Sequence, residues 1–351
     1  MTQDPNPPQN RALARNATRN LDSASGRRRH GRATQRAPRL QFRFLAIWIA
    51  LAILVGLCAI FLPRSVALMT FRLIMPFIAF LAIAAMGQAL VIMARGIDLS
   101  VPGTVAIASA VVLGVSNGSD DRLWIALVAA LGVATLIGML NGVLVAVFKL
   151  NALIVTLAVG AIVAGITLWY RQGFAAEAKV PEMLADAASA RIATLPVAAW
   201  VALAVMVALT ILLRKTVMGR RFEAVGANPA AAHATGVEIM RFQVGAFAVA
   251  GLLYGLMAVL LSGFIRNPTL AVGDPYLLAP IAAAVLGGTA ITGGIGSMVA
   301  VLGAAIFVMQ LDQASKMMGL ATSWQLIVQG VAIAAGMWLS QIATRAGRGS
   351  V

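Results

Sequence analysis

Residues 73–94 read LIMPFIAFLAIAAMGQALVIMA, a run without a single charged side chain. A helix needs about 20 apolar residues to cross the hydrocarbon core of a bilayer, and this run is long enough. The rest of the chain has a similar composition, because 60% of its 351 residues are apolar and only 11% are charged. Soluble domains average about half apolar and a quarter charged. The sequence therefore predicts an all-α membrane protein.

Apolar runs of this kind recur along the chain and predict a polytopic protein with about ten transmembrane helices. The third, eighth and ninth runs are short for a full crossing, which leaves a count of eight or nine open. The runs are residues 44–62, 73–94, 101–115, 123–148, 152–170, 197–213, 242–261, 277–291, 298–310 and 324–342.

The net charge of +15 is concentrated before the first apolar run. Residues 1–43 carry ten arginines there, and the positive-inside rule keeps this tail in the cytosol. The tail lacks apolar periodicity, so we expect it to be disordered. Juxtamembrane arginines favour anchoring to anionic lipid of the bilayer, a simpler use than binding nucleic acid or a regulator. We therefore expect a lipid partner and no nucleic acid.

Ten crossings put both chain ends on one side, so we expect the N- and C-termini to be cytoplasmic. The membrane domain is then residues 44–342, followed by a short cytoplasmic tail, residues 343–351. The basic loop 214–241 also falls inside, whereas residues 171–191 mix acids with bases and fall outside. Charge and span count therefore agree, with outer Arg64 and Arg72 as mild exceptions.

The basic loop 214–241 contains the signals of a short helix. Asn228 is a good N-cap, Pro229 suits the first helical position, and Gly236 accepts the left-handed conformation that ends a helix. A helix of about two turns is marginal alone in water, so it needs a surface to lie against. We interpret it as a docking helix for a soluble partner.

Residues 95–103, RGIDLSVPG, interrupt the apolar pattern between the second and third runs. Gly96 loosens one helix, and Ser100 with Pro102 begins the next. Irregular backbone at membrane depth persists only where protein or a watery cavity satisfies it. Asp98 and the free backbone groups are thus candidates for hydrogen-bonding a polar solute in transit. The alternative is that Asp98 or Ser100 merely caps a helix.

A second break, residues 287–297, reads GGTAITGGIGS and separates the eighth and ninth runs. Its GIGS weakly echoes GIDLS of the first break and hints at an internal repeat. Gly287 and Gly288 either take part in gating and the pathway or permit close helix packing, the commoner use of glycine in membranes.

Four further polar residues are expected to be buried in the membrane domain: Gln88, Asn141, Asn151 and Thr156. An amide without a partner is costly there, so each either bonds a neighbouring helix or faces the cavity.

The sequence offers few candidates for catalytic residues. His30 and His233 lie in different segments, no Ser, His and Asp set shares a membrane depth, and Cys58 is the only cysteine. No Gly-rich nucleotide-binding loop ending in Lys-Ser/Thr is present. We expect no enzyme activity, metal or cofactor in this chain, and if ATP drives the protein, another chain must bind the ATP and its Mg²⁺.

Several strings resemble one family, the integral-membrane permeases of bacterial ABC importers for ribose and related monosaccharides. That group also includes branched-chain amino acid permeases. Residues 96–100 resemble its most recognisable string, and residues 219–229, GRRFEAVGANP, resemble its cytoplasmic coupling loop. The remaining similar strings are Asn141–Gly142, residues 152–157 (ALIVTL), residues 283–289 and residues 293–296.

The resemblance implies a permease in the bacterial inner membrane that imports a monosaccharide. Its partners would be cytosolic ABC ATPase subunits, a periplasmic sugar-binding protein and a second permease subunit, identical or related. Residues implied in coupling to the ATPase are Arg221, Glu223, Ala224, Gly226, Asn228, Pro229 and Gly236. Residues expected along the translocation pathway are Gln88, Gly96, Asp98, Ser100, Asn141, Asn151, Thr156, Gly287 and Gly288.

The chain departs from the family pattern at several positions. Arg95 stands where the family usually has a second glycine, and Pro102-Gly103 follows Ser100 where another glycine is usual. Leu277 and Ala279 replace acids that commonly follow a tyrosine such as Tyr276. The lost acids bear on the identity of the sugar and leave the coupling loop untouched.

Two alternatives belong to other transport classes. A branched-chain amino acid permease would need groups for both a carboxylate and an ammonium ion, which the sequence does not clearly display. An ion-coupled secondary transporter would also use broken helices near the midplane. It normally needs an ion or proton site, for which Asp98 is the clear acidic candidate at such a break.

Overall fold

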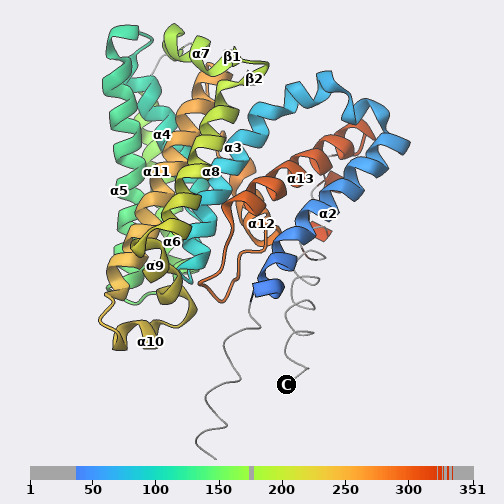
Figure 1. Ribbon diagram of the computed structural model, residues 1–351. Helices are drawn as coiled ribbons and strands as arrows, with labels where there is room; N and C mark the ends of the chain where they lie inside the picture. Colours follow the sequence, from blue (N-terminus) through green and yellow to red (C-terminus); the bar gives the residue numbers. More distant parts are fainter. Residues whose placement is uncertain are drawn as a thin grey trace, which may run out of the picture. The chain divides into compact units, whose positions relative to one another are not determined.

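The computed structural model describes residues 37–173 and 178–321, together with 323–325, 327, 330, 331 and 334 (Figure 1). The described chain is mostly helical. Its elements are α2 (Ala37–Phe61), η1 (Pro63–Val66), α3 (Leu68–Met93), α4 (Val101–Ser116), η2 (Asp120–Arg122), α5 (Leu123–Ala146), α6 (Ala152–Arg171), α7 (Glu182–Ser189), β1 (Arg191–Ile192), β2 (Leu195–Pro196), α8 (Val197–Lys215), α9 (Val217–Ala227), α10 (Pro229–Ala234), α11 (Ile239–Ile265), η3 (Asp274–Tyr276), α12 (Ala279–Leu286) and α13 (Met298–Met317).

Helices α3 and α11 are the most enclosed of the long helices. In their most apolar stretches, 89% of the α3 residues and 67% of the α11 residues are buried inside the protein, against 11% in α2. The two helices pack on each other, α5 and α4 pack on α11, and α12 and α13 pack on α3. The outer helices α2, α5, α6 and α8 instead expose many large apolar side chains, as lipid-facing helices do.

Helices α5 and α11 approach each other through glycines. A Cβ atom at Gly138 would lie 2.2 Å from the backbone oxygen of Phe247, and one at Gly251 would lie 2.4 Å from that of Ala134. The two backbones therefore touch without side chains between them. Small residues permit this close contact in membrane helix pairs, where van der Waals packing drives association.

Seven of the described helices are long and apolar enough to cross a membrane, which confirms an all-α polytopic protein. The third and eighth predicted runs form shorter apolar helices, residues 101–116 and 274–286. The ninth forms a full-length helix of 20 residues. The predicted tenth span lies largely outside the described residues, as do most of the basic tail and residues 343–351. The count of ten and the orientation of the termini stay predictions.

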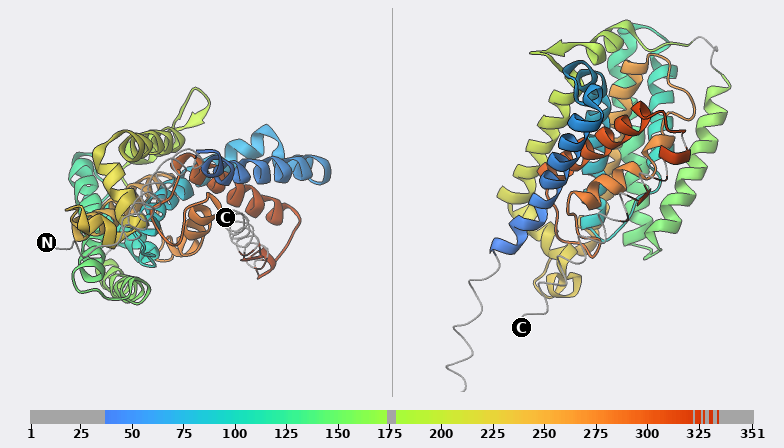
Figure 2. Two further views of the ribbon diagram at one scale, coloured as in Figure 1. Left: turned by 60° about the horizontal axis from the view of Figure 1, so that its bottom comes forward. Right: turned by 90° about the vertical axis from the view of Figure 1, so that its right-hand side faces the viewer.

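Helix α7 and the β1–β2 hairpin lie at the end of the bundle opposite α9 and α10, as both Figure 1 and Figure 2 show. The hairpin pairs Ile192 with Leu195, and its turn residues Ala193 and Thr194 both have positive φ. Two such residues in succession are typical of a type I′ turn, which matches the twist of short hairpins. From the sequence, only a loop with mixed charges was expected here.

Candidate functional site

The predicted docking helix is α10, and its local signals are confirmed. The side-chain oxygen of Asn228 accepts a hydrogen bond from the backbone nitrogen of Ala231 at 3.1 Å. Pro229 occupies the first helical position, and Gly236 has a φ of +80°. The helix has six residues, slightly fewer than the two turns expected.

Helix α9 was not predicted, and it precedes α10 in the basic loop. Thr216 caps it: its hydroxyl accepts from the backbone nitrogen of Gly219 at 3.0 Å and donates to the backbone oxygen of Leu212 at 2.6 Å. A Cβ at Gly219 would lie 2.3 Å from that same oxygen, so glycine is required where α8 turns into α9. A threonine before the helix was the N-cap signal available in the sequence.

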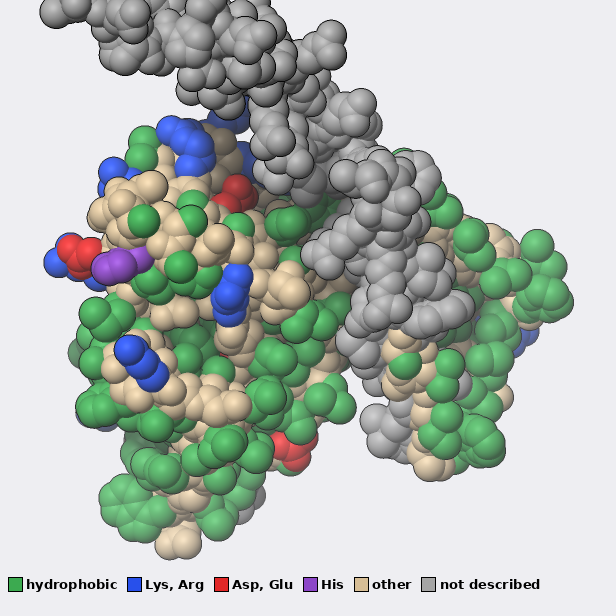
Figure 3. Space-filling view, turned by 90° about the horizontal axis from the view of Figure 1, so that it is seen from below, with side chains coloured by type: hydrophobic (Ala, Val, Ile, Leu, Met, Phe, Trp, Pro, Cys, Tyr) green, Lys and Arg blue, Asp and Glu red, His purple; other side chains and the backbone are tan. Residues whose placement is uncertain are grey.

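The loop presents an exposed basic surface at one end of the molecule (Figure 3). Arg221 and Ala224 are exposed on α9, whereas Glu223 is partly buried. Burial raises the pKa of the Glu223 carboxyl, and the nearby charge of Arg214 opposes that shift with a smaller effect. The surface therefore combines exposed cations with one partly desolvated acid, a combination that suits a polar protein interface.

Gly226 lies where α9 meets the two breaks. A Cβ there would lie 2.1 Å from the backbone oxygen of Met93 and 2.5 Å from the backbone nitrogen of Gly294. These two atoms also bond each other, because the Gly294 nitrogen donates to the Met93 oxygen at 2.9 Å. The end of α3, the second break and α9 thus meet at one point. The second break was expected from the sequence, but its contact with α9 and the end of α3 was not.

Asp98 and Ser100 lie fully buried in the first break and form a hydrogen-bonded chain with Asn141 of α5. The backbone nitrogen and hydroxyl of Ser100 donate to Oδ1 of Asp98 at 2.8 Å and 2.6 Å. The Asn141 amide donates to the Ser100 hydroxyl at 2.8 Å. Within the described chain, Oδ2 of Asp98 has no hydrogen-bond partner. Oδ1 of Asn141 is likewise buried without a partner, so the network fixes the break and leaves two buried acceptors unused.

Gln88 and Tyr254 hold the break from the other side. The surrounding donors and acceptors orient the Gln88 amide so that its nitrogen donates to the backbone oxygen of Asp98 at 3.2 Å. Its oxygen then accepts from the backbone nitrogen of Asp98 at 3.1 Å, and the Tyr254 hydroxyl lies 2.9 Å from its nitrogen. Tyr254 lies 166 positions away in sequence, so no local pattern could have indicated this partner.

Thr156 and Gly96 complete the contacts around the first break. The Thr156 hydroxyl accepts from the backbone nitrogen of Leu99 at 2.9 Å and donates to the backbone oxygen of Ala152, in its own helix, at 2.8 Å. A Cβ at Gly96 would lie 2.8 Å from the ring of Phe247, so glycine allows α11 to pack against the break. Helices α3, α5, α6 and α11 thus all contact this segment.

The remaining predicted pathway residues lie elsewhere. The expectation that Asn151 is buried is wrong: it is exposed and caps α6, accepting from the backbone nitrogen of Leu153 at 2.9 Å. A Cβ at Gly287 would lie 2.8 Å from the Val301 backbone, so this glycine packs α12 against α13. Gly288 has a φ of +83°, which suits the turn into the second break.

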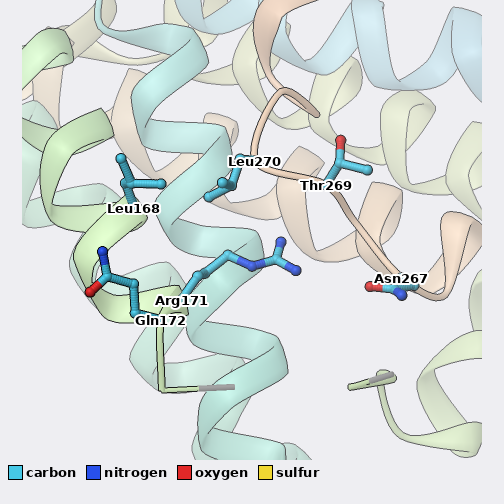
Figure 4. A pocket seen from close by; sticks show the side chains of 6 residues that line it. All are labelled: Leu168, Arg171, Gln172, Asn267, Thr269 and Leu270. Atoms are coloured by element: carbon cyan, nitrogen blue, oxygen red, sulfur yellow. The ribbon is translucent and has the colours of Figure 1, made fainter. Parts of the chain in front are cut away.

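An open polar recess lies between the C-terminal end of α6 and the segment after α11 (Figure 4). Arg171 donates a hydrogen bond to the backbone oxygen of Pro268 beside it. Helix α11 has 27 residues and begins soon after α10, so this recess lies roughly 40 Å from the docking helix at 1.5 Å rise per residue. The recess is lined by Leu168, Arg171, Gln172, Asn267, Thr269 and Leu270.

Among the described residues, no group of three or more His, Cys, Asp or Glu side chains lies close enough to hold a metal ion. His233 is exposed on α10 and Cys58 is buried without a disulfide. His30 lies outside the described residues. What the geometry provides is a hydrogen-bonded break in the protein interior, joined to an exposed basic loop.

The family model described as branched-chain amino acid transport system / permease component matches residues 70–336 of this chain. The matched range contains both breaks, the buried network and the loop with α9 and α10. The chain belongs to this permease family. Its members are transport subunits rather than enzymes, and ATP is hydrolysed by separate subunits of the transporter.

Three similar relatives are bacterial permeases. The ribose import permease protein RbsC of Escherichia coli (strain K12) is 30% identical over 288 residues, covering 81% of this chain and 89% of the relative. The L-arabinose transport system permease protein AraH of the same strain is 29% identical, covering 89% and 96%. The autoinducer 2 import system permease protein LsrC of Enterobacter sp. (strain 638) is 30% identical, covering 84% and 85%. No solved structure matches the chain.

Proposed function

We propose that this chain is the permease subunit of an ATP-driven importer for a monosaccharide, located in the bacterial inner membrane. The similarity to ribose and arabinose permeases over more than four-fifths of the chain carries the proposal. These relatives favour a sugar over a branched-chain amino acid as cargo. The apolar helices that span a membrane by length and composition agree with a multi-pass subunit.

The docking surface for cytosolic ABC ATPase subunits is α10 with the exposed side of α9. Asn228, Pro229 and Gly236 define a short helix whose ends are fixed by local geometry. Arg221 and Ala224 are exposed beside it, and Glu223 is partly exposed. ATP and Mg²⁺ belong to the ATPase partner. We place α9, α10 and the basic loop in the cytosol, and ten spans, if that count holds for the whole chain, would put both termini on the same side.

The opposite end, with α7 and the β1–β2 hairpin, then faces the periplasm and a sugar-binding protein that delivers cargo. A second permease subunit, a copy or a close relative, completes the passage. In the single chain the polar residues of the first break are buried and bonded to each other. They hold the break in shape beside the passage, and the unused oxygens of Asp98 and Asn141 are the acceptors available to a solute when the break opens.

Coupling follows from the junction at Gly226. Because a Cβ at Gly226 would overlap the Met93 oxygen and the Gly294 nitrogen, α9 lies in direct backbone contact with the end of α3, just before the first break, and with the second break. ATP binding on the partner displaces α9 and α10, and this contact passes the displacement to the breaks. The permease switches between outward and inward states as a packed, two-state element.

The direct test is uptake by the complete transporter in proteoliposomes, with radiolabelled ribose or arabinose outside and ATP beside the ATPase. We expect ATP-dependent accumulation by the wild type. Deletion of Pro229–Gly236 abolishes uptake while the protein still inserts, because the docking helix is gone. Normal uptake by this deletion would refute the docking assignment.

Two single substitutions at Asn228 distinguish loss of the helix cap from replacement of the asparagine side chain. Asn228→Ala removes the N-cap, which weakens a helix by about 1 kcal/mol, and we expect reduced uptake. Asn228→Asp keeps a capping oxygen and serves as the matched control with uptake near wild type. Accumulation against a gradient by the chain alone, driven only by sodium or protons, would overturn the proposed function.

A further inference from the structure

Arg95 has an unusual backbone conformation at the junction between α3 and the first break. It follows the end of α3, begins the first break, and has a φ of +70°. Its backbone nitrogen still bonds the Ile92 oxygen at 2.9 Å, so the conformation belongs to the turn that ends α3. Left-handed backbone favours glycine because a Cβ atom is crowded there. An arginine at this position needs contacts that hold it.

The Arg95 side chain supplies those contacts by reaching α9. Its Nε donates to the backbone oxygen of Gly226 at 2.7 Å, and one terminal nitrogen donates to that of Ala227 at 2.8 Å. Both oxygens belong to the last turn of α9, where carbonyls lack partners within the helix and carry the negative end of its dipole. The planar guanidinium can bond two neighbouring acceptors at once, which a lysine ammonium does less well.

The second break packs against the same side chain. A Cβ at Gly293 would lie 2.5 Å from Cγ of Arg95 and 2.6 Å from the backbone oxygen of Gly226. Gly293 and Gly294 have φ values of +90° and +77°, so this loop curves around the arginine. Arg95 therefore connects the first break, the second break and the end of α9.

We propose that Arg95 is a positioning residue that ties the docking loop to the first break and so couples ATP hydrolysis to movement of the pathway. This proposal rests on the proposed function as an ATP-driven permease. Asp98, with its buried network, lies three positions after Arg95 in the same irregular segment. A displacement of α9 pulls on the guanidinium and reaches that network through a short stretch of backbone.

The decisive variant is Arg95→Gly in the complete transporter, with ATP hydrolysis and sugar uptake measured in the same proteoliposomes. Glycine suits the backbone at this position, so we expect normal insertion. We expect the ATP hydrolysed per sugar imported to rise at least roughly tenfold, because each of the two charged hydrogen bonds that are lost carries about that factor. Arg95→Lys keeps the charge but lacks the planar guanidinium, so its ratio of ATP to sugar should fall between those of the wild type and Arg95→Gly.

Arg266 offers a matched control at the other end of the molecule. It also has a positive φ, +68°, and it caps α11 with an exposed side chain. Arg266→Gly removes an arginine side chain from another position of positive φ, with loss of only its exposed ion pair to Asp186, and we expect a wild-type ratio of ATP to sugar. The proposal is overturned if Arg95→Gly keeps the wild-type ratio, or if its uptake and hydrolysis fall in equal proportion.

Hydrogen exchange of the purified permease gives a readout without solute or ATP. Loss of the tie should speed amide exchange in both residues 96–100 and 217–236 in Arg95→Gly and, less strongly, in Arg95→Lys. Unchanged exchange in both variants would also reject the tie. If the wild-type transporter imports no monosaccharide, the proposed function fails, while the exchange experiment still decides whether Arg95 joins the two segments.

Discussion

The two breaks in this permease are built on different principles. The first, residues 95–100, is held by side chains, because Asp98, Ser100 and their partners on neighbouring helices bond one another in the interior. The second, residues 287–297, is held by backbone shape, with Gly288, Gly293 and Gly294 at positive φ. The first should therefore be sensitive to the loss of polar atoms, and the second to the addition of a single carbon.

Gly294→Ala should have the largest effect. Its Cβ would lie 2.4 Å from the backbone nitrogen of Ala227, at a φ of +77°. Overpacking and left-handed strain together should destabilise the protein by about 3–5 kcal/mol, measured as lost thermal stability in detergent. Gly245→Ala on α11 meets nothing within 4 Å and is the control. Equal stability of the two variants would show that backbone shape and close packing do not determine the second break.

Asp98→Ala tests the first break. It removes the acceptor for two buried donors of Ser100, and unsatisfied buried donors cost about 1–3 kcal/mol each. We expect a destabilisation of about 3 kcal/mol by thermal unfolding in detergent. Asp98→Asn keeps an oxygen at the same place and should lose less. If the alanine variant is no less stable than the asparagine variant, side-chain bonds do not hold this break.

Tyr254→Phe sharpens the comparison by removing one hydroxyl next to Gln88. The ring remains to fill the space, so we expect the loss of a single buried hydrogen bond, about 1 kcal/mol. The same thermal assay measures it. A loss as large as that of Asp98→Ala would show that the outer contacts of the network matter as much as its centre.

Glu223 should give the smallest effect, at the junction below both breaks. Its pKa is raised by partial burial above an ordinary value of about 4.5. A carboxyl whose pKa is raised on folding binds its proton more tightly in the folded state, so stability falls as pH rises from that value through the raised pKa. Glu223→Gln should remove this decline in a series of thermal unfolding curves. An identical decline in the variant would assign it to other groups.

Local signals in the sequence predicted local structure well. Asn228, Pro229 and Gly236 define α10 as expected, because capping and left-handed termination depend on neighbouring residues only. The position of the first break was also readable, since Gly96 and Asp98 interrupt an apolar pattern. Helix α9 was missed, because its three charged residues and two glycines in eleven positions are typical of a loop, whereas a threonine cap and tight packing fix it as a helix.

Contacts between distant segments could not be predicted. The partnership of Tyr254 with Gln88, and the meeting of Gly226 with Gly294, depend on how helices pack rather than on any local pattern. Asn151 was expected to be buried because apolar residues follow it, yet it lies at the exposed start of α6. Each break adjoins one long helix and one short one, and the short helices α4 and α12 are the third and eighth apolar runs, which fall short of a full crossing.

The glycine contact between α5 and α11 has a mechanical consequence. Side chains between helices act as a soft layer that lets one helix slide or tilt against another. At Gly138 and Gly251 that layer is missing, and backbone rests directly on backbone. We therefore expect the pair to move as one rigid unit during a transport cycle, and bending to occur in the irregular segments elsewhere in the chain.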